Sequence, residues 1–164
     1  MPMFTITMRS GRRGSDKGAI SAAIHAASVS AGYPENDMFQ RFFSLEADDL
    51  LIDPTYPGLA KPRTEELLMI EVLVSSGTET KQKHALLAAL IARLDAVGVD
   101  RNDVMVFFGE IDRASSSFAN GQLAPPVVLG EQEASSATEL RPSPAGWRDG
   151  VYSTSPTRPA HSGR

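Results

Sequence analysis

Residues 1–8, Met1-Pro2-Met3-Phe4-Thr5-Ile6-Thr7-Met8, alternate apolar and hydroxyl-bearing side chains from Phe4 to Met8. A period of two is typical of a β-strand that turns one face toward a core. The stretch therefore predicts a strand at the start of the sequence. The segments after it decide which fold this strand joins.

A helix and a second strand are predicted to follow. Residues 10–14 form a glycine-containing loop. In residues 19–30 the apolar side chains recur at intervals of three and four, which is typical of a helix with a narrow apolar stripe, and Gly32 ends the pattern. Residues 38–45 are rich in phenylalanine and predict the second strand.

The same order of elements returns after an irregular connection over residues 46–66, where Asp53-Pro54 and Tyr56-Pro57-Gly58 are turn signals. The second half is predicted to hold an apolar strand at 67–74, a small-residue loop at 75–78, a helical stripe at 86–94 and a strand at 104–111. Each half is therefore one strand–helix–strand unit.

The two halves are related by a constant offset of 66 residues. Identical residues at this offset fall in loops, at helix ends and at strand starts: Ser10 and Ser76, Gly11 and Gly77, Gly32 and Gly98, Asn36-Asp37 and Asn102-Asp103. We interpret the pattern as a duplication, with repeat halves at about 2–45 and 67–111.

Two β-α-β units predict an α+β fold. A crossover helix makes the two strands of its unit parallel, so the pair of units predicts a four-stranded mixed sheet with both helices on one face. We expect one domain over residues 1–124. The other face of the sheet needs cover, and self-association is the economical way to provide it, so we expect an oligomer.

Composition argues against several functional classes. The chain has 164 residues and a net charge of −4, whereas a nucleic-acid-binding domain normally shows a basic face. No apolar run is long enough to span a membrane, and no signal peptide is visible. With no cysteine and three dispersed histidines, we expect no metal and no other cofactor, in a cytoplasmic protein.

The composition changes after Ala124. Residues 125–164 hold six of the eleven prolines, together with serines and scattered charges of both signs. Such a segment has too few aliphatic side chains to form its own core. We expect an extended or disordered tail.

Pro2 carries the most specific chemical prediction. Removal of Met1 would leave Pro2 with a secondary amine, whereas with Met1 in place the same nitrogen is an amide without a basic lone pair. A terminal amine titrates at about 7.7–8.0, and burial favours its neutral form. A neutral amine at the start of a strand is a candidate general base.

At these positions the sequence resembles the tautomerase superfamily, and within it the fused, double-length members of the malonate semialdehyde decarboxylase branch. The resemblance covers roughly residues 2–123. Besides Pro2 and the duplicated unit, it is carried by Gly32-Tyr33-Pro34-Glu35-Asn36-Asp37-Met38-Phe39-Gln40, Ile52-Asp53-Pro54-Thr55-Tyr56, Lys81-Gln82-Lys83 and Ser117-Phe118-Ala119-Asn120-Gly121. It implies a homotrimer.

The resemblance also implies a reaction. Tautomerases of this kind use the neutral proline amine for keto–enol proton transfer on a small keto or enol acid, without a cofactor. Decarboxylase and dehalogenase relatives instead use the proline as an acid. Their loop before the second helix usually carries arginines, whereas Ser75-Ser76-Gly77-Thr78 carries none, so a decarboxylase is the less favoured reading.

The candidate site residues follow from this resemblance and from the residue types. The proposed catalytic pair is Pro2 and Asp37, and the proposed substrate-binding residues are Phe39, Arg41, Ser76, Thr78 and Phe118. Asp37 is as well explained by a strand-entry role, and Phe39 and Phe118 by packing. Ser76 and Thr78 would contribute backbone amides at a helix N-terminus. Arg41 would bind a carboxylate, or Arg12 or Arg13 would do so.

A non-enzymatic interpretation stays open. Two strand–helix–strand units are also the order of elements in ferredoxin-like domains, many of which only bind ligands or copies of themselves. In such a binding module Pro2 would be incidental, and the missing arginines would cost nothing.

Overall fold

The computed structural model describes residues 2–12 and 17–125. Its elements, in chain order, are β1 (Met3–Arg9), α1 (Lys17–Ser30), β2 (Phe39–Leu45), β3 (Leu68–Ser75), α2 (Thr80–Ala96) and β4 (Val104–Ile111). Three 3-10 turns lie in the connections: η1 (Ala47–Asp49), η2 (Arg101–Asp103) and η3 (Arg113–Ser115). The predicted α+β fold is confirmed. The predicted tail, residues 125–164, lies almost entirely outside the described residues.

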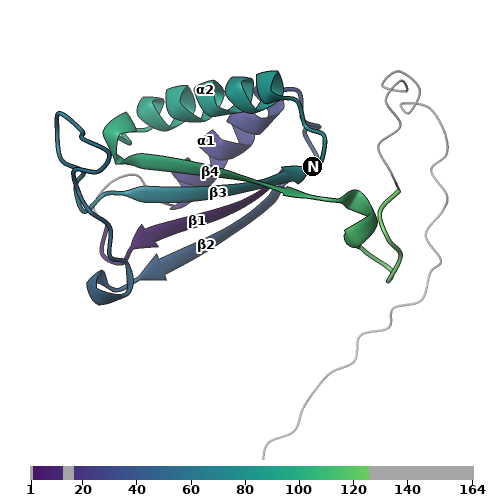
Figure 1. Ribbon diagram of the computed structural model, residues 1–164, viewed down its shortest axis with the longest axis horizontal. Helices are drawn as coiled ribbons and strands as arrows, with labels where there is room; N and C mark the ends of the chain where they lie inside the picture. The colour runs from purple at the N-terminus through teal and green to yellow at the C-terminus, as the bar shows by residue number, and fades with distance from the viewer. Residues whose placement is uncertain (1, 13–16, 126–164) are drawn as a thin grey trace, which may run out of the picture. The chain divides into compact units, whose positions relative to one another are not determined.

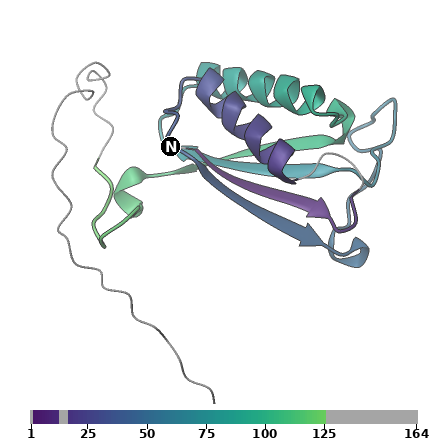
Figure 2. The same ribbon diagram turned by 180° about the vertical axis from the view of Figure 1, so that it is seen from behind.

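The four strands form one mixed sheet in the order β2-β1-β3-β4. Within each unit the strands are parallel, and the two units meet where β1 runs antiparallel to β3. Both helices cover the same face of the sheet, as Figures 1 and 2 show from opposite sides. The predicted architecture of two crossover units is therefore the observed one.

The core lies between the sheet and the helices. Alternate residues of each central strand point into it, so that Ile6 and Ile70 have no exposed surface. The stripe of α1 contributes Ile20 and Ile24, and that of α2 contributes Leu86, Leu90 and Leu94, all fully buried. Tertiary packing of these stripes, more than helix propensity, stabilises helices of this length.

The duplication extends to individual hydrogen bonds. Ser10 N donates to Leu45 O over 2.7 Å, and Ser76 N donates to Ile111 O over 2.9 Å, which is the same bond displaced by the repeat offset. In both loops the next residue is a glycine with positive φ, +71° at Gly11 and +85° at Gly77. A side chain would strain that conformation, so the same glycine turn is required twice.

Loop 75–78 does not end in a cap for α2. The N-cap residue is Glu79, and the Thr78 hydroxyl instead donates to Ser75 O over 2.6 Å. The Thr78 hydroxyl therefore closes the glycine turn and does not cap the helix.

The side chains on the helix-free face of the sheet form three rows that run across the strands. Strand register places one residue of each strand at the same level, in the order β2, β1, β3, β4. From the Pro2 end the rows are Phe39, Met3, Leu73 and Gly109; Arg41, Thr5, Glu71 and Phe107; Phe43, Thr7, Met69 and Met105. The outer rows are apolar except for Thr7, and the middle row holds the charges.

Candidate active site

The Pro2 end of the sheet collects segments that are distant in sequence. β1 and β2 begin there, and β3 and β4 end there, because the two units run in opposite directions. Five predicted site residues lie at or next to this edge: Asp37, Phe39, Ser76, Thr78 and Phe118. The topology thus brings together what the sequence spread over more than eighty residues.

Pro2 is buried at this edge. The next residue, Met3, is flanked by Phe39 on β2 and by Leu73 on β3. The ring of Phe39 lies 6.2 Å from that of Phe118, measured between centroids, so the segment after β4 reaches back to the start of β2. An aromatic pair therefore stands beside the first strand at the Pro2 end.

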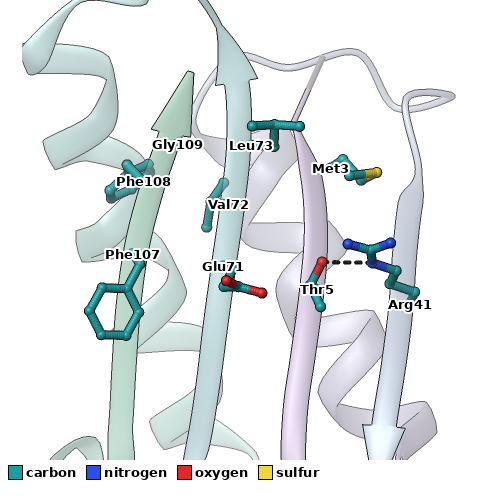
Figure 3. A pocket seen from close by; sticks show the side chains of 9 residues that line it. All are labelled: Met3, Thr5, Arg41, Glu71, Val72, Leu73, Phe107, Phe108 and Gly109. Carbon is teal, nitrogen blue, oxygen red and sulfur yellow. Dashed lines mark hydrogen bonds between the residues drawn. The ribbon is translucent and has the colours of Figure 1, made fainter. Parts of the chain in front are cut away.

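Arg41 lies one row further along the helix-free face. It lines a hollow of about 280 Å³ shared with Met3, Thr5, Glu71, Leu73 and Phe107 (Figure 3). Its guanidinium Nε donates to the Thr5 hydroxyl over 2.8 Å, and its guanidinium carbon Cζ lies 5.7 Å from the centre of the Phe43 ring. Phe43 is on the side away from Pro2, so the carboxylate-binding role of Arg41 stays a prediction.

The backbone amides of loop 75–78 are already used. Ser76 N donates to Ile111 O, and Thr78 N donates to Ser75 O over 3.1 Å. The Gly77 N–H donates to the Glu110 carboxylate. The expectation that Ser76 and Thr78 offer amides to a substrate is therefore wrong for this loop conformation, because the turn and β4 take these donors.

Glu110 also pairs with a cation of α2. The Lys83 ammonium donates to its carboxylate, and this bond, more than the Gly77 N–H, lowers the pKa of Glu110. Lys83 is therefore neutralised by a residue of the chain itself.

Asp37 shares its loop with a tyrosine that the sequence did not single out. The pKa of Tyr33 is raised, chiefly by burial and also by the charge of Asp37. Its hydroxyl therefore stays protonated and can donate a hydrogen bond beside that carboxylate. Tyr33 lies in the quoted stretch 32–40, but the sequence assigned it no role, because the shift of its pKa depends on burial and on Asp37.

Arg113 is a second residue that sequence reasoning missed. Its guanidinium lies 5.6 Å from the centre of the Phe118 ring, and its Nε donates to Pro125 O over 2.8 Å. It follows β4 in η3, a position without periodicity or motif. Only the folding back of residues 112–118 places this cation near the aromatic pair.

Arg12 lies at the wrong end of the sheet for Pro2. It follows the carboxyl end of β1, whereas Pro2 precedes the amino end. There its Nε pairs with the Glu66 carboxylate over 3.0 Å, its side chain is 5% exposed, and burial lowers its pKa. The alternative that Arg12 holds the substrate of this Pro2 is therefore wrong, and Arg13 falls outside the described residues.

Among the described residues there is neither a candidate metal site nor a helix that could span a membrane. Residues 2–12 and 17–125 contain no group of three or more His, Cys, Asp or Glu side chains arranged to hold a metal ion. In the same part of the chain no helix has the length and apolar character needed to cross a membrane.

Comparison with known families and structures identifies the family of the chain. The model of the tautomerase enzyme family matches residues 37–119, half of the chain, and the chain therefore belongs to that family. FG41 malonate semialdehyde decarboxylase, solved with the inhibitor 3-bromopropiolate, is 26% identical with a TM-score of 0.65, over 73% of this chain and 91% of that one. A search of curated proteins found no match.

More distant structures share the fold alone. N1, a member of the cis-3-chloroacrylic acid dehalogenase family, is 20% identical with a TM-score of 0.60, over 76% of this chain and 84% of that one. The Q0 fused 4-OT, a symmetric trimer, is 22% identical with a TM-score of 0.58, over 74% of this chain and 95% of that one.

Proposed function

We propose that this protein is a tautomerase that uses the amine of Pro2, exposed by removal of Met1, to move a proton next to the carbonyl of a small keto or enol acid. The observation that carries the proposal is the place of Pro2. It is buried at the one edge of the sheet where Asp37, Tyr33 and the Phe39–Phe118 pair also gather.

The proton transfer follows from these groups. In the keto-to-enol direction the neutral amine of Pro2 takes a proton from the carbon beside the carbonyl and becomes a secondary ammonium. The C–H electrons form the new C=C bond, and the π electrons of the carbonyl move to its oxygen, which takes a proton from water. The Pro2 ammonium then returns its proton to the hydroxide that remains. Asp37 accepts the hydrogen bond of the resulting enol hydroxyl. Burial favours the uncharged amine that the first step requires.

A decarboxylase is the second candidate. It is favoured by the 26% identity to malonate semialdehyde decarboxylase, a larger value than those of the dehalogenase and fused 4-OT structures. Against it stands loop 75–78, which has no arginine to bind the carboxylate that would leave. Release of CO₂ from malonate semialdehyde by the purified protein would move this candidate to first place.

We further propose that the protein works as a homotrimer. The helix-free face exposes Phe43 and Phe107 at 46% and 50%, a cost that a partner copy would remove. The fused 4-OT structures solved as trimers support this assembly by their shared fold.

The test of the catalytic claim is Pro2→Ala, assayed with phenylenolpyruvate. The variant retains a primary amine of different basicity and geometry, and we expect kcat/KM to fall by at least about 100-fold, the size of a general-base contribution. Intact mass must first show that Met1 is absent from the active protein. Full activity in Pro2→Ala, or in protein that keeps Met1, would refute the role of the amine.

A further inference from the structure

At the far end of the sheet, residues equivalent by the repeat offset to those of the candidate site bind other residues of the chain. There Arg12 binds the Glu66 carboxylate through Nε over 3.0 Å, and Asp103 accepts from the backbone N–H and hydroxyl of Thr64 over 2.7 and 2.6 Å. Arg12 and Asp103 are both shielded from water. The Arg12 side chain is 5% exposed and Asp103 is 3% exposed. At this end, then, the arginine position binds a carboxylate and the aspartate position binds a hydroxyl and an N–H, all within the chain.

The repeat offset relates this end to the Pro2 end residue by residue. Asp103 corresponds to Asp37, Arg12 to Thr78, and Leu68, the first residue of β3, to Pro2. The backbone supports the correspondence, because Asp37 N bonds to Pro34 O as Asp103 N bonds to Asp100 O. Strand register repeats as well, with Met3 opposite Phe39 and Met69 opposite Met105.

Glu66 precedes Leu68 by two residues, so its equivalent place lies directly ahead of the Pro2 nitrogen. A substrate in contact with that nitrogen would occupy the same place. The far end therefore shows a carboxylate bound by the residue at the Arg12 position, and a hydroxyl bound by the aspartate, in the arrangement that an enol acid would need at the Pro2 end.

The Pro2 end differs at one of these two positions. Asp37 keeps the aspartate, but Thr78 stands where the arginine would be, and its hydroxyl is bonded to Ser75 O. In α2, the helix that follows the loop, Lys83 is paired with Glu110. Loop 75–78 therefore offers no positive charge to a carboxylate ahead of Pro2.

We propose that Thr78 is the specificity-determining residue of the Pro2 site. Its neutral side chain makes the wild-type site indifferent to a carboxylate beside the reacting carbonyl, so that neutral carbonyl compounds, such as esters and ketones, are substrates as good as keto acids. The inference rests on the proposed function of Pro2 but concerns selection between substrates, which can fail separately.

The test compares phenylenolpyruvate with its methyl ester, which differ only in the negative charge. In wild type we expect kcat/KM for the acid and for the ester to agree within about threefold. In Thr78→Arg we expect the acid-to-ester ratio to rise by about 10- to 100-fold, the range of a charge-assisted hydrogen bond. Most of the change should be in KM for the acid.

Two control variants isolate the charge. Thr78→Gln has a long neutral side chain and should leave the ratio at its wild-type value, and Arg12→Thr removes the far cation and should also leave it there. Circular dichroism must show that each variant is folded. A wild-type preference of 10-fold or more for the acid would overturn the proposal and assign the carboxylate to Arg41 or Arg113.

Measuring ligand affinity tests the role of Thr78 independently of the catalytic role of Pro2. In a Pro2→Ala background, calorimetry should give similar Kd values for phenylpyruvate and its methyl ester, and adding Thr78→Arg should tighten the acid alone. An unchanged Kd for the acid would refute the inference even if Pro2 proves catalytic. Tighter binding of the acid alone would sustain the inference even if Pro2 does not.

Discussion

At the scale of single residues, the duplication places an aspartate at equivalent positions of the two halves, and the two aspartates have different surroundings. Asp103 is 3% exposed and holds the connection before β3 through Thr64, whereas Asp37 at the equivalent position is only half-buried. From sequence the two aspartates are equivalent positions of the repeat. Their difference arises because the connection packs against one of them.

Asp103→Asn should lower the free energy of unfolding by about 1 to 3 kcal/mol, because the amide has one accepting oxygen in place of two and loses the charge-assisted hydrogen bonds from the N–H and hydroxyl of Thr64. Urea denaturation measures the change. Asp48→Asn, at an exposed aspartate of η1, is the control and should change stability by less than about 0.5 kcal/mol. Equal losses in the two variants would contradict the structural role of Asp103.

At the scale of elements, the start of α2 is tied to the end of β4. Lys83 and the Gly77 N–H both bind Glu110, so the helix, its preceding loop and the edge strand share one carboxylate. The pattern K-x-K at Lys81 and Lys83 does not reveal which lysine is paired. The helix phase decides it, because only one of the two faces β4.

This tie predicts an acid-dependent loss of stability. The pKa of Glu110 is lower in the folded protein than in the unfolded chain. The stabilisation that Glu110 provides is therefore fully present above its pKa in the unfolded chain, and it is lost as the pH falls through its pKa in the folded protein. Thermal melts from pH 6 to pH 3 should therefore show a smaller loss of Tm in Lys83→Met than in wild type. Lys81→Met is the matched control, and it should lose Tm as wild type does.

At the scale of the whole molecule, the helix-free face is where we propose that the copies of a trimer meet. Its outer rows are mainly apolar, and its middle row carries Arg41 and Glu71 on either side of Thr5. A face of this kind is buried against another copy in most oligomers, and the charges of the middle row would fix the register of that contact.

Light scattering should therefore give a mass near three times that of the 17.6 kDa chain. Phe43→Lys should shift the mass toward the monomer, because its row on the helix-free face (Thr7, Met69 and Met105) holds no carboxylate to pair with a charge buried at the interface. Val29→Lys, on the exposed side of α1, adds the same charge elsewhere and should keep the wild-type mass. A monomeric wild type would refute the assembly.

The sequence by itself determined the two units, their parallel strands and the shared helix face, because hydrophobic period and glycine positions act locally and were repeated at one offset. It also marked Pro2, Asp37, Phe39 and Phe118 as candidates for one site, although not their catalytic roles. Local pattern is enough for this much.

Only the tertiary structure decided which cations and amides are available. In the folded protein Arg12 lies at the far end of the sheet and pairs with Glu66, and Arg113 lies next to Phe118. The amides of loop 75–78 are hydrogen-bonded within the fold. These outcomes depend on contacts between residues far apart in the chain. Charge pairing and burial of that kind are properties of the folded arrangement, which no local pattern encodes.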